Sequence, residues 1–80
     1  MGSVHLKDVL GKKIKHLRLE FGITQTVLSK RSGIFRTHVS RIECGTANPT
    51  LTAIVALARA LEVAPATLLV ERHTPRDAAD

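Results

Sequence analysis

Residues 24–43 constrain the fold of this chain more than any other stretch of its sequence. Thr24 stands just before a short helical segment, where a threonine hydroxyl can accept a hydrogen bond from a free amide of the first turn. Gly33 then interrupts the helical pattern, because glycine readily takes the positive φ of a sharp turn between helices. The stretch therefore predicts two short helices, over residues 25–31 and 35–44, joined by a tight turn.

The second of these helices has two different faces. Val39 and Ile42 are three residues apart and form its inward, apolar face. The opposite face carries side chains that reach and hydrogen-bond but have no packing role in a small domain, namely Arg36, Thr37, Ser40 and Arg41. Two helices joined by a glycine turn, the second with a polar and basic outer face, are typical of a helix-turn-helix motif that reads DNA.

A wider pattern extends from about Leu10 to Leu69. Its residues, in chain order and at matching spacing, are Arg18, Gly22, Gln25, Leu28, Ser29, Gly33, Ile42, Glu43, Gly45, Asn48 and Pro49. In this pattern the chain resembles the Cro and lambda-repressor class of bacterial helix-turn-helix regulators, also called the xenobiotic-response-element class. The resemblance implies an all-α, compact five-helix bundle. It also implies a sequence-specific transcriptional regulator that acts as a homodimer on an inverted-repeat operator in double-stranded DNA.

Several kinds of protein share this small fold. The controller proteins of restriction-modification genes are similar in size and in the run formed by Arg36, Thr37 and Ser40, while phage repressors and some antitoxins also fit the size. The alternative function is an antitoxin-type or other protein-interaction module that uses the same fold mainly to bind a partner protein. Residues 71–80 offer few apolar anchors for such a partner, which argues against this alternative.

The resemblance also assigns roles at the DNA. The expected base-contacting residues are Arg36, Thr37, Ser40 and Arg41, since the planar fork of arginine fits the O6 and N7 acceptors of guanine. The expected contacts with the DNA backbone from the motif helices and the linker are Thr24, Gln25, His38 and Asn48, and His38 is equally suited to a base. Independently of the resemblance, Lys13 in the first helix is a further expected backbone contact, with a role only in keeping the surface soluble as the alternative.

Three further residues are singled out by the family pattern. Arg18 and Glu43 are expected to form a structural ion pair that pins the first helix to the reading helix. Phe35 departs from the pattern, which usually has Ser, Thr or Asp there as an N-cap. Because a phenylalanine side chain cannot accept a capping hydrogen bond, the helix is expected to be about 1 kcal/mol less stable. We expect the ring to pack inward, with contact to a thymine methyl or a sugar as the alternative.

The 80 residues amount to one small domain. The sequence is 44% hydrophobic but only 2% aromatic, so its core must consist of Leu, Ile, Val and Ala, which suits packed helices better than sheets. We expect a flexible N-terminus over residues 1–5, the DNA-binding domain with C-terminal dimerisation helices over residues 6–70, and a flexible tail over residues 71–80.

The net charge of +5 is unevenly distributed. Residues 1–48 contain nine Lys and Arg and three Asp and Glu, which gives a net charge of +6. Residues 49–80 contain three Lys and Arg and four Asp and Glu, which gives a net charge of −1. The positive field therefore belongs to the half that contains the motif, as expected for a surface that meets a phosphate backbone. A generic solvated basic surface would give the same totals.

The C-terminal part carries more apolar side chains than one small core needs. The surplus residues are Val55, Val63, Leu68, Leu69 and Val70. An apolar patch on a small protein usually marks an interface, and relatives of this size commonly pair through their last helices. These residues are therefore the expected homodimer interface, and a slightly apolar monomer is the alternative.

Other functions find little support in the sequence. Cys44 is the only cysteine, so an internal disulfide is impossible, and no histidine is placed to complete a metal site with it. No nucleophile–base pair, paired carboxylates or phosphate-binding glycine loop is present, so we expect no enzyme, cofactor, metal or small-molecule ligand. The absence of a long apolar stretch or signal pattern predicts a cytoplasmic protein. The family resemblance implies an origin in a bacterium or phage and association with the nucleoid when the protein is bound to DNA.

Overall fold

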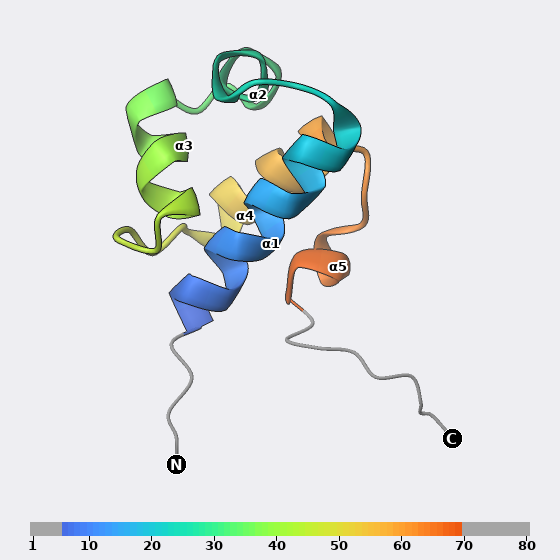
Figure 1. Cartoon of the computed structure of the whole chain (residues 1–80). Coiled ribbons are helices and arrows are strands. Elements are labelled where there is room, and N and C mark those ends of the chain that lie inside the picture. Colours follow the sequence, from blue (N-terminus) through green and yellow to red (C-terminus); the bar gives the residue numbers. More distant parts are fainter. Residues whose placement is uncertain (1–5, 70–80) are drawn as a thin grey trace, which may run out of the picture.

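The computed structural model describes residues 6–69 of the chain, and these form five helices without a strand (Figure 1). The helices are α1 (Leu6–Phe21), α2 (Gln25–Ser32), α3 (Arg36–Glu43), α4 (Leu51–Ala60) and α5 (Pro65–Leu69). The expected all-α, five-helix architecture is therefore confirmed. The predictions of a flexible N-terminus and a flexible tail concern residues outside the described range.

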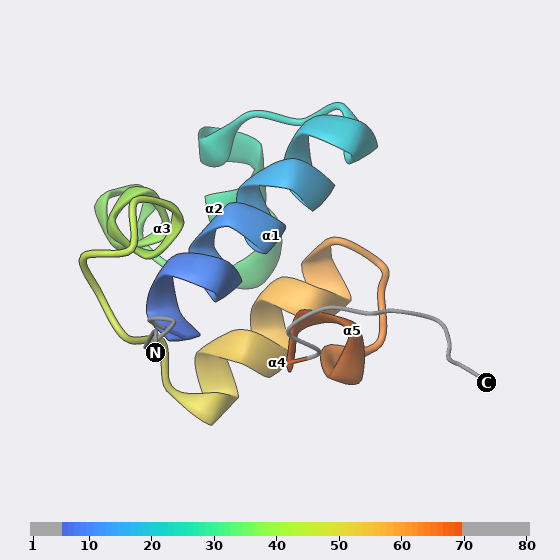
Figure 2. The ribbon, with the colours of Figure 1, turned by 60° about the horizontal axis from the view of Figure 1, so that its bottom comes forward.

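The five helices are arranged around α1, which runs through the middle of the molecule. α1 packs against α3 and α5, which lie on opposite sides of it (Figures 1 and 2). α2 bridges α3 and α4, and α4 in turn packs against α5. The two motif helices, α2 and α3, are thus held by α1 and α4 rather than by each other alone. No helix of the described residues is long and apolar enough to cross a membrane.

Every helix contributes to a single aliphatic core. Its members are Leu10, Ile14, Leu28, Val39, Ile42, Ile54, Leu57, Ala58, Ala60, Leu61 and Leu68. Leu10 and Ile14 come from the predicted apolar stripe of α1, and Val39 and Ile42 are the predicted inward face of α3. At about 25 cal/mol per Å² of buried apolar surface, such a core is the main stabilising contribution in a domain of this size.

The apolar stripes of α1 and α4 include Phe21 and Leu51 by their spacing, but both residues lie at the surface. Leu51 is 68% exposed, and Phe21 is also exposed, with the guanidinium of Arg31 4.8 Å from its ring centroid. Each is the terminal residue of its helix, α4 or α1. The spacing of apolar residues correctly predicts the direction in which each side chain points from the helix axis. The neighbouring helices, however, do not cover the ends of α1 and α4.

The start of α4 is set by a threonine cap. The helix begins at Leu51 because Thr50 is its N-cap: the Thr50 hydroxyl accepts a hydrogen bond from the amide of Ala53 at 3.1 Å. Pro49 therefore lies in the linker, outside the helix.

Gly11 lies in the middle of α1, where glycine is normally unfavourable. A Cβ atom at this position would overlap the carbonyl oxygen of Ile42 and would lie 2.9 Å from that of Glu43. Only glycine therefore allows α1 to approach the C-terminal end of α3 this closely. Nothing in the helical pattern of the sequence indicated this contact.

Candidate nucleic-acid interface

The start of α2 and the turn that follows it are formed by residues that the sequence indicated. Thr24 caps α2 with its hydroxyl, which accepts a hydrogen bond from the amide of Val27 at 3.1 Å. Gly33 ends α2 in the left-handed region, at φ 79°, and its amide donates to the carbonyl of Ser29 at 2.8 Å. The hydroxyl of Ser29 donates to the carbonyl of Ile34, which links the end of α2 to the residue just before α3's N-cap. α3 therefore leaves the turn in a fixed direction.

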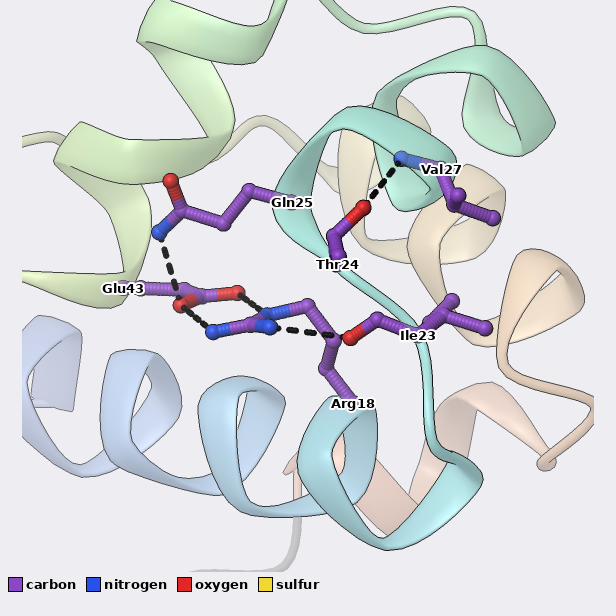
Figure 3. A network of polar contacts seen from close by, with 6 residues as sticks. All are labelled: Arg18, Ile23, Thr24, Gln25, Val27 and Glu43. Carbon is purple, nitrogen blue, oxygen red and sulfur yellow. Dashed lines mark hydrogen bonds and ion pairs between the residues drawn. The ribbon is translucent and has the colours of Figure 1, made fainter.

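A buried ion pair joins α1 to the end of α3 (Figure 3). The guanidinium of Arg18 donates from Nε to Oε2 of Glu43 at 2.7 Å and from Nη2 to Oε1 at 3.0 Å. Arg18 is only 8% exposed and Glu43 only 6%. The remaining nitrogen of Arg18, Nη1, donates to the carbonyl of Ile23 at 2.9 Å. This bidentate pair, which the family resemblance implied, sets the position of α3 relative to α1.

Gln25, the first residue of α2, joins the same network (Figure 3). Its Nε2 donates to Oε1 of Glu43 at 3.0 Å. Because a carboxylate only accepts hydrogen bonds, the amide nitrogen must face Glu43, and this fixes the orientation of the Gln25 amide. One Nε2 proton remains for another acceptor. Glu43 therefore ties together α1, α2 and α3, a link that the sequence did not reveal.

The outer face of α3 carries the four expected base-contacting residues. Arg36, Thr37 and Arg41 are exposed, and Ser40 is half-buried. Thr37 and Arg41 are four residues apart and lie on the same face, as do Arg36 and Ser40. Within residues 6–69, the side chains of Arg36 and Arg41 have no hydrogen bond or ion pair. The face therefore presents two guanidinium groups whose donors are available to a ligand.

Phe35 is the N-cap residue of α3 and makes no capping hydrogen bond with its side chain, as expected for phenylalanine. The prediction that its ring packs inward is wrong, because Phe35 is 83% exposed. Its backbone is extended, at φ −55° and ψ 142°, and the neighbouring Ile34 packs against the core. The place against the core is therefore filled by Ile34, and the Phe35 ring is turned outward.

The expected backbone contacts are placed in different parts of the molecule. Thr24 and Gln25 lie together at the start of α2, His38 is half-buried in α3, and Asn48 is exposed in the linker beyond α3.

Lys13 does not belong with these four residues. Its Nζ donates to the carbonyl of Thr67 in α5 at 3.1 Å, and α5 lies on the opposite side of α1 from α3 (Figure 2). In this structure Lys13 is therefore directed toward α5, and its contact with the DNA backbone stays a prediction.

The expected dimer interface is also divided by the structure. Leu68 is 2% exposed and Val63 packs against the core, so the prediction for Leu68 is corrected: α5 supplies this side chain to its own domain. Leu69 is exposed and Val55 is half-buried, whereas Val70 lies outside the described residues. Leu51 is also exposed, on α4.

Leu51 and Val55 line an open groove between α4 and the end of α2. The groove also contains Arg31 and Arg59. Apolar side chains therefore remain at the surface on α4 and α5, although they are not the set that the sequence suggested.

Comparisons with known proteins agree with this geometry. A helix-turn-helix family model matches residues 14–68. An uncharacterised HTH-type transcriptional regulator of Sinorhizobium fredii, y4dJ, is 36% identical over 72 residues, which are 90% of this chain and 88% of the relative.

Solved structures with the same fold include two restriction-modification controller proteins. C.AhdI from Aeromonas hydrophila is 34% identical, with a TM-score of 0.76, and the match covers 78% of this chain and 94% of the relative. C.Esp1396I is 31% identical, with a TM-score of 0.76, and the match covers 84% and 88%. A structure of a point mutant of C.Esp1396I, bound to its highest affinity operator site, is also similar to this chain.

The chain therefore belongs to the helix-turn-helix family of the xenobiotic-response-element type, as the sequence pattern predicted. Members of this family are DNA-binding transcriptional regulators, and this chain is one of them.

Proposed function

We propose that this protein binds a specific inverted-repeat operator as a homodimer and regulates transcription there from the cytoplasm. The observation that carries the proposal is the outer face of α3. It presents the unpaired guanidinium groups of Arg36 and Arg41, while the helix beneath them is fixed by the buried pair of Arg18 and Glu43. A fixed helix with free, outward donors is what readout of base edges in a major groove requires.

The chemistry of the four side chains suggests their roles. Arg36 and Arg41 each match the two acceptors of a guanine, and a good bidentate contact discriminates against the wrong base by about 1–3 kcal/mol. Thr37 and Ser40 offer a hydroxyl to a base or a phosphate, and Thr37 also offers a methyl group.

The start of α2 is suited to the phosphate backbone. Thr24 and Gln25 lie at a helix N-terminus, where the free amides and the helix dipole favour an anion. The Gln25 amide keeps one proton for a phosphate oxygen while the other is donated to Glu43. His38 and Asn48 are proposed to contact the same backbone from α3 and from the linker.

Assembly into a dimer rests on the apolar side chains left at the surface. Leu69 on α5 and Leu51 and Val55 on α4 support an interface formed by these two helices. A two-fold dimer would place two copies of α3 on half-sites whose centres are about 34–36 Å apart. This spacing predicts an operator with inverted symmetry.

Similarity to C.AhdI and C.Esp1396I, together with the run of Arg36, Thr37 and Ser40, supports a more particular role. We propose that this protein is a controller of restriction-modification genes. Mapping the selected binding site onto the host genome tests this role. Sites upstream of such genes support it, and sites confined to unrelated genes contradict it.

Selection of bound sites from random DNA, combined with sedimentation of the protein at micromolar concentration, tests the main proposal. We expect a dimer and an inverted repeat, and Arg41→Ala should abolish the preference at one base pair of each half-site. Lys12→Ala is the control, because it removes one positive charge from an exposed position of α1 outside the motif. A pool without a consensus would contradict sequence-specific binding.

A further inference from the structure

Phe35 combines two features that are unfavourable for the free protein. Its ring is the most exposed of the large apolar side chains in the described residues, at 83%. It also occupies the N-cap of α3, where Ser, Thr, Asp or Asn would satisfy an amide that the phenyl ring leaves without a side-chain partner. Neither feature stabilises the fold, and the position of the ring at the start of α3 makes it a candidate for contact with whatever α3 meets.

The backbone on both sides of Phe35 is held in place. The Phe35 carbonyl accepts a hydrogen bond from the amide of Val39 at 2.9 Å, which begins α3, and the preceding Ile34 packs against the core. The ring is therefore carried on a fixed base, directly beside Arg36 at the N-terminal end of the reading helix. In helix-turn-helix motifs this end of the helix approaches the base edges.

The surroundings of the ring favour DNA over a protein partner. From residue 36 to residue 43 no large apolar side chain is exposed, and the exposed residues there are polar or positively charged. The core of a protein interface is usually apolar, and α3 offers no second large apolar side chain at the surface to build one. DNA is a polyanion with isolated apolar groups, so it matches a single ring followed by cations. The edges of base pairs in the major groove present only one such group, the C5-methyl of thymine.

We propose that Phe35 is a specificity-determining residue that contacts the C5-methyl group of a thymine in each half-site. The proposal rests on the proposed DNA-reading function of α3 and extends it by one base pair. The operator half-site should then contain a thymine next to the base pair that Arg36 reads. Recognition of this thymine uses no hydrogen bond, which distinguishes it from the readout by the two arginines.

The experiment compares wild-type protein with Phe35→Ala. Site selection with both proteins first identifies the position at which the variant loses its preference for thymine. The thymine at that position is then replaced by deoxyuridine, which removes only the methyl group. For the wild-type protein we expect an affinity loss of about three- to fivefold for each methyl removed. Phe35→Ala should bind both DNAs with the same, lower affinity.

Phe35→Ser separates this role from a structural one. Serine can cap α3, so the melting temperature of the DNA-free variant should rise by about 4–8 °C. The same variant should lose the preference for thymine over deoxyuridine. A ring that served the fold would instead give a lower melting temperature in both Phe35→Ser and Phe35→Ala.

Several results would overturn the inference. If replacing the thymine by deoxyuridine lowered the affinity equally for wild-type protein and Phe35→Ala, the ring would not touch the methyl group. A uniform loss for Phe35→Ala on all sequences would indicate a sugar or phosphate contact, and a change in sedimentation alone would indicate a protein contact. A wild-type protein that selects no consensus would instead contradict the proposed function itself, and the inference with it.

Discussion

Removal of the Glu43 carboxylate should strongly destabilise the DNA-free protein. In Glu43→Ala, Arg18 would remain buried with only one of its three hydrogen bonds, the one from Nη1 to the carbonyl of Ile23. The amide of Gln25 would lose its acceptor as well. The variant therefore leaves an unpaired positive charge in a site from which water is largely excluded.

The structure sets the expected size of this effect. Breaking a buried ion pair by removing one partner costs about 3–5 kcal/mol. Because Arg18 keeps one hydrogen bond and is 8% exposed, we expect the lower end, about 3 kcal/mol. For a domain of this size that loss corresponds to a decrease in melting temperature of roughly 12–24 °C. Thermal unfolding followed by far-UV circular dichroism measures it directly.

Two controls make the measurement specific. Glu20→Ala removes the same type of side chain from an exposed pair with His16, 3.1 Å away, and should hardly change the melting temperature. The double variant Arg18→Met, Glu43→Leu removes both charges and should be more stable than Glu43→Ala. If Glu43→Ala melts within a few degrees of the wild-type protein and of Glu20→Ala, the pair is screened by solvent and the reasoning is refuted.

The other predictions concern packing, assembly and readout. Gly11→Ala should lower the melting temperature despite the better helix propensity of alanine, because overpacking costs about 1–3 kcal/mol; an unchanged melt would contradict the close approach of α1 to α3. Leu69→Asp should convert the dimer to a monomer in sedimentation and weaken operator binding, and a monomer that binds the full site unchanged would refute the interface. Arg36→Ala and Arg41→Ala should each relax preference at one base pair in titrations against single-base variants, whereas Gln25→Ala should weaken all sites alike. If both arginine variants lost the same affinity on every site, the two arginines would be contacts with the DNA backbone.

The helices and most of the core could be predicted from the sequence because local signals determine them. Gly33 and Thr24 mark the turn and the start of α2, and the apolar spacing of Leu10 and Ile14 marks the buried face of α1. Such spacing gives the direction of a side chain around the helix axis. It does not give the length over which neighbouring helices cover that face, and Leu51 is therefore exposed although its spacing places it on the apolar stripe of α4.

Contacts between distant parts of the chain were harder to predict. The role of Gly11 depends on two backbone carbonyls of α3 that lie more than thirty residues further along the chain. The orientation of Lys13 could not be predicted either, because the helix rotation that brings Gly11 to α3 turns Lys13 toward α5. Counting apolar residues likewise could not show that Leu68 is buried in its own domain, on a helix that packs against α1 and α4.

The family pattern gave Gln25 and Glu43 separate roles, one at the DNA backbone and one in the fold. Their hydrogen bond joins these roles, because the carboxylate that pairs with Arg18 also orients the amide offered to a phosphate. A loss of DNA affinity in Glu43→Ala therefore does not show that Glu43 contacts DNA. Gln25→Ala removes the proposed phosphate contact but leaves the ion pair intact, so the two variants together separate the positioning of the amide from the stability of the domain.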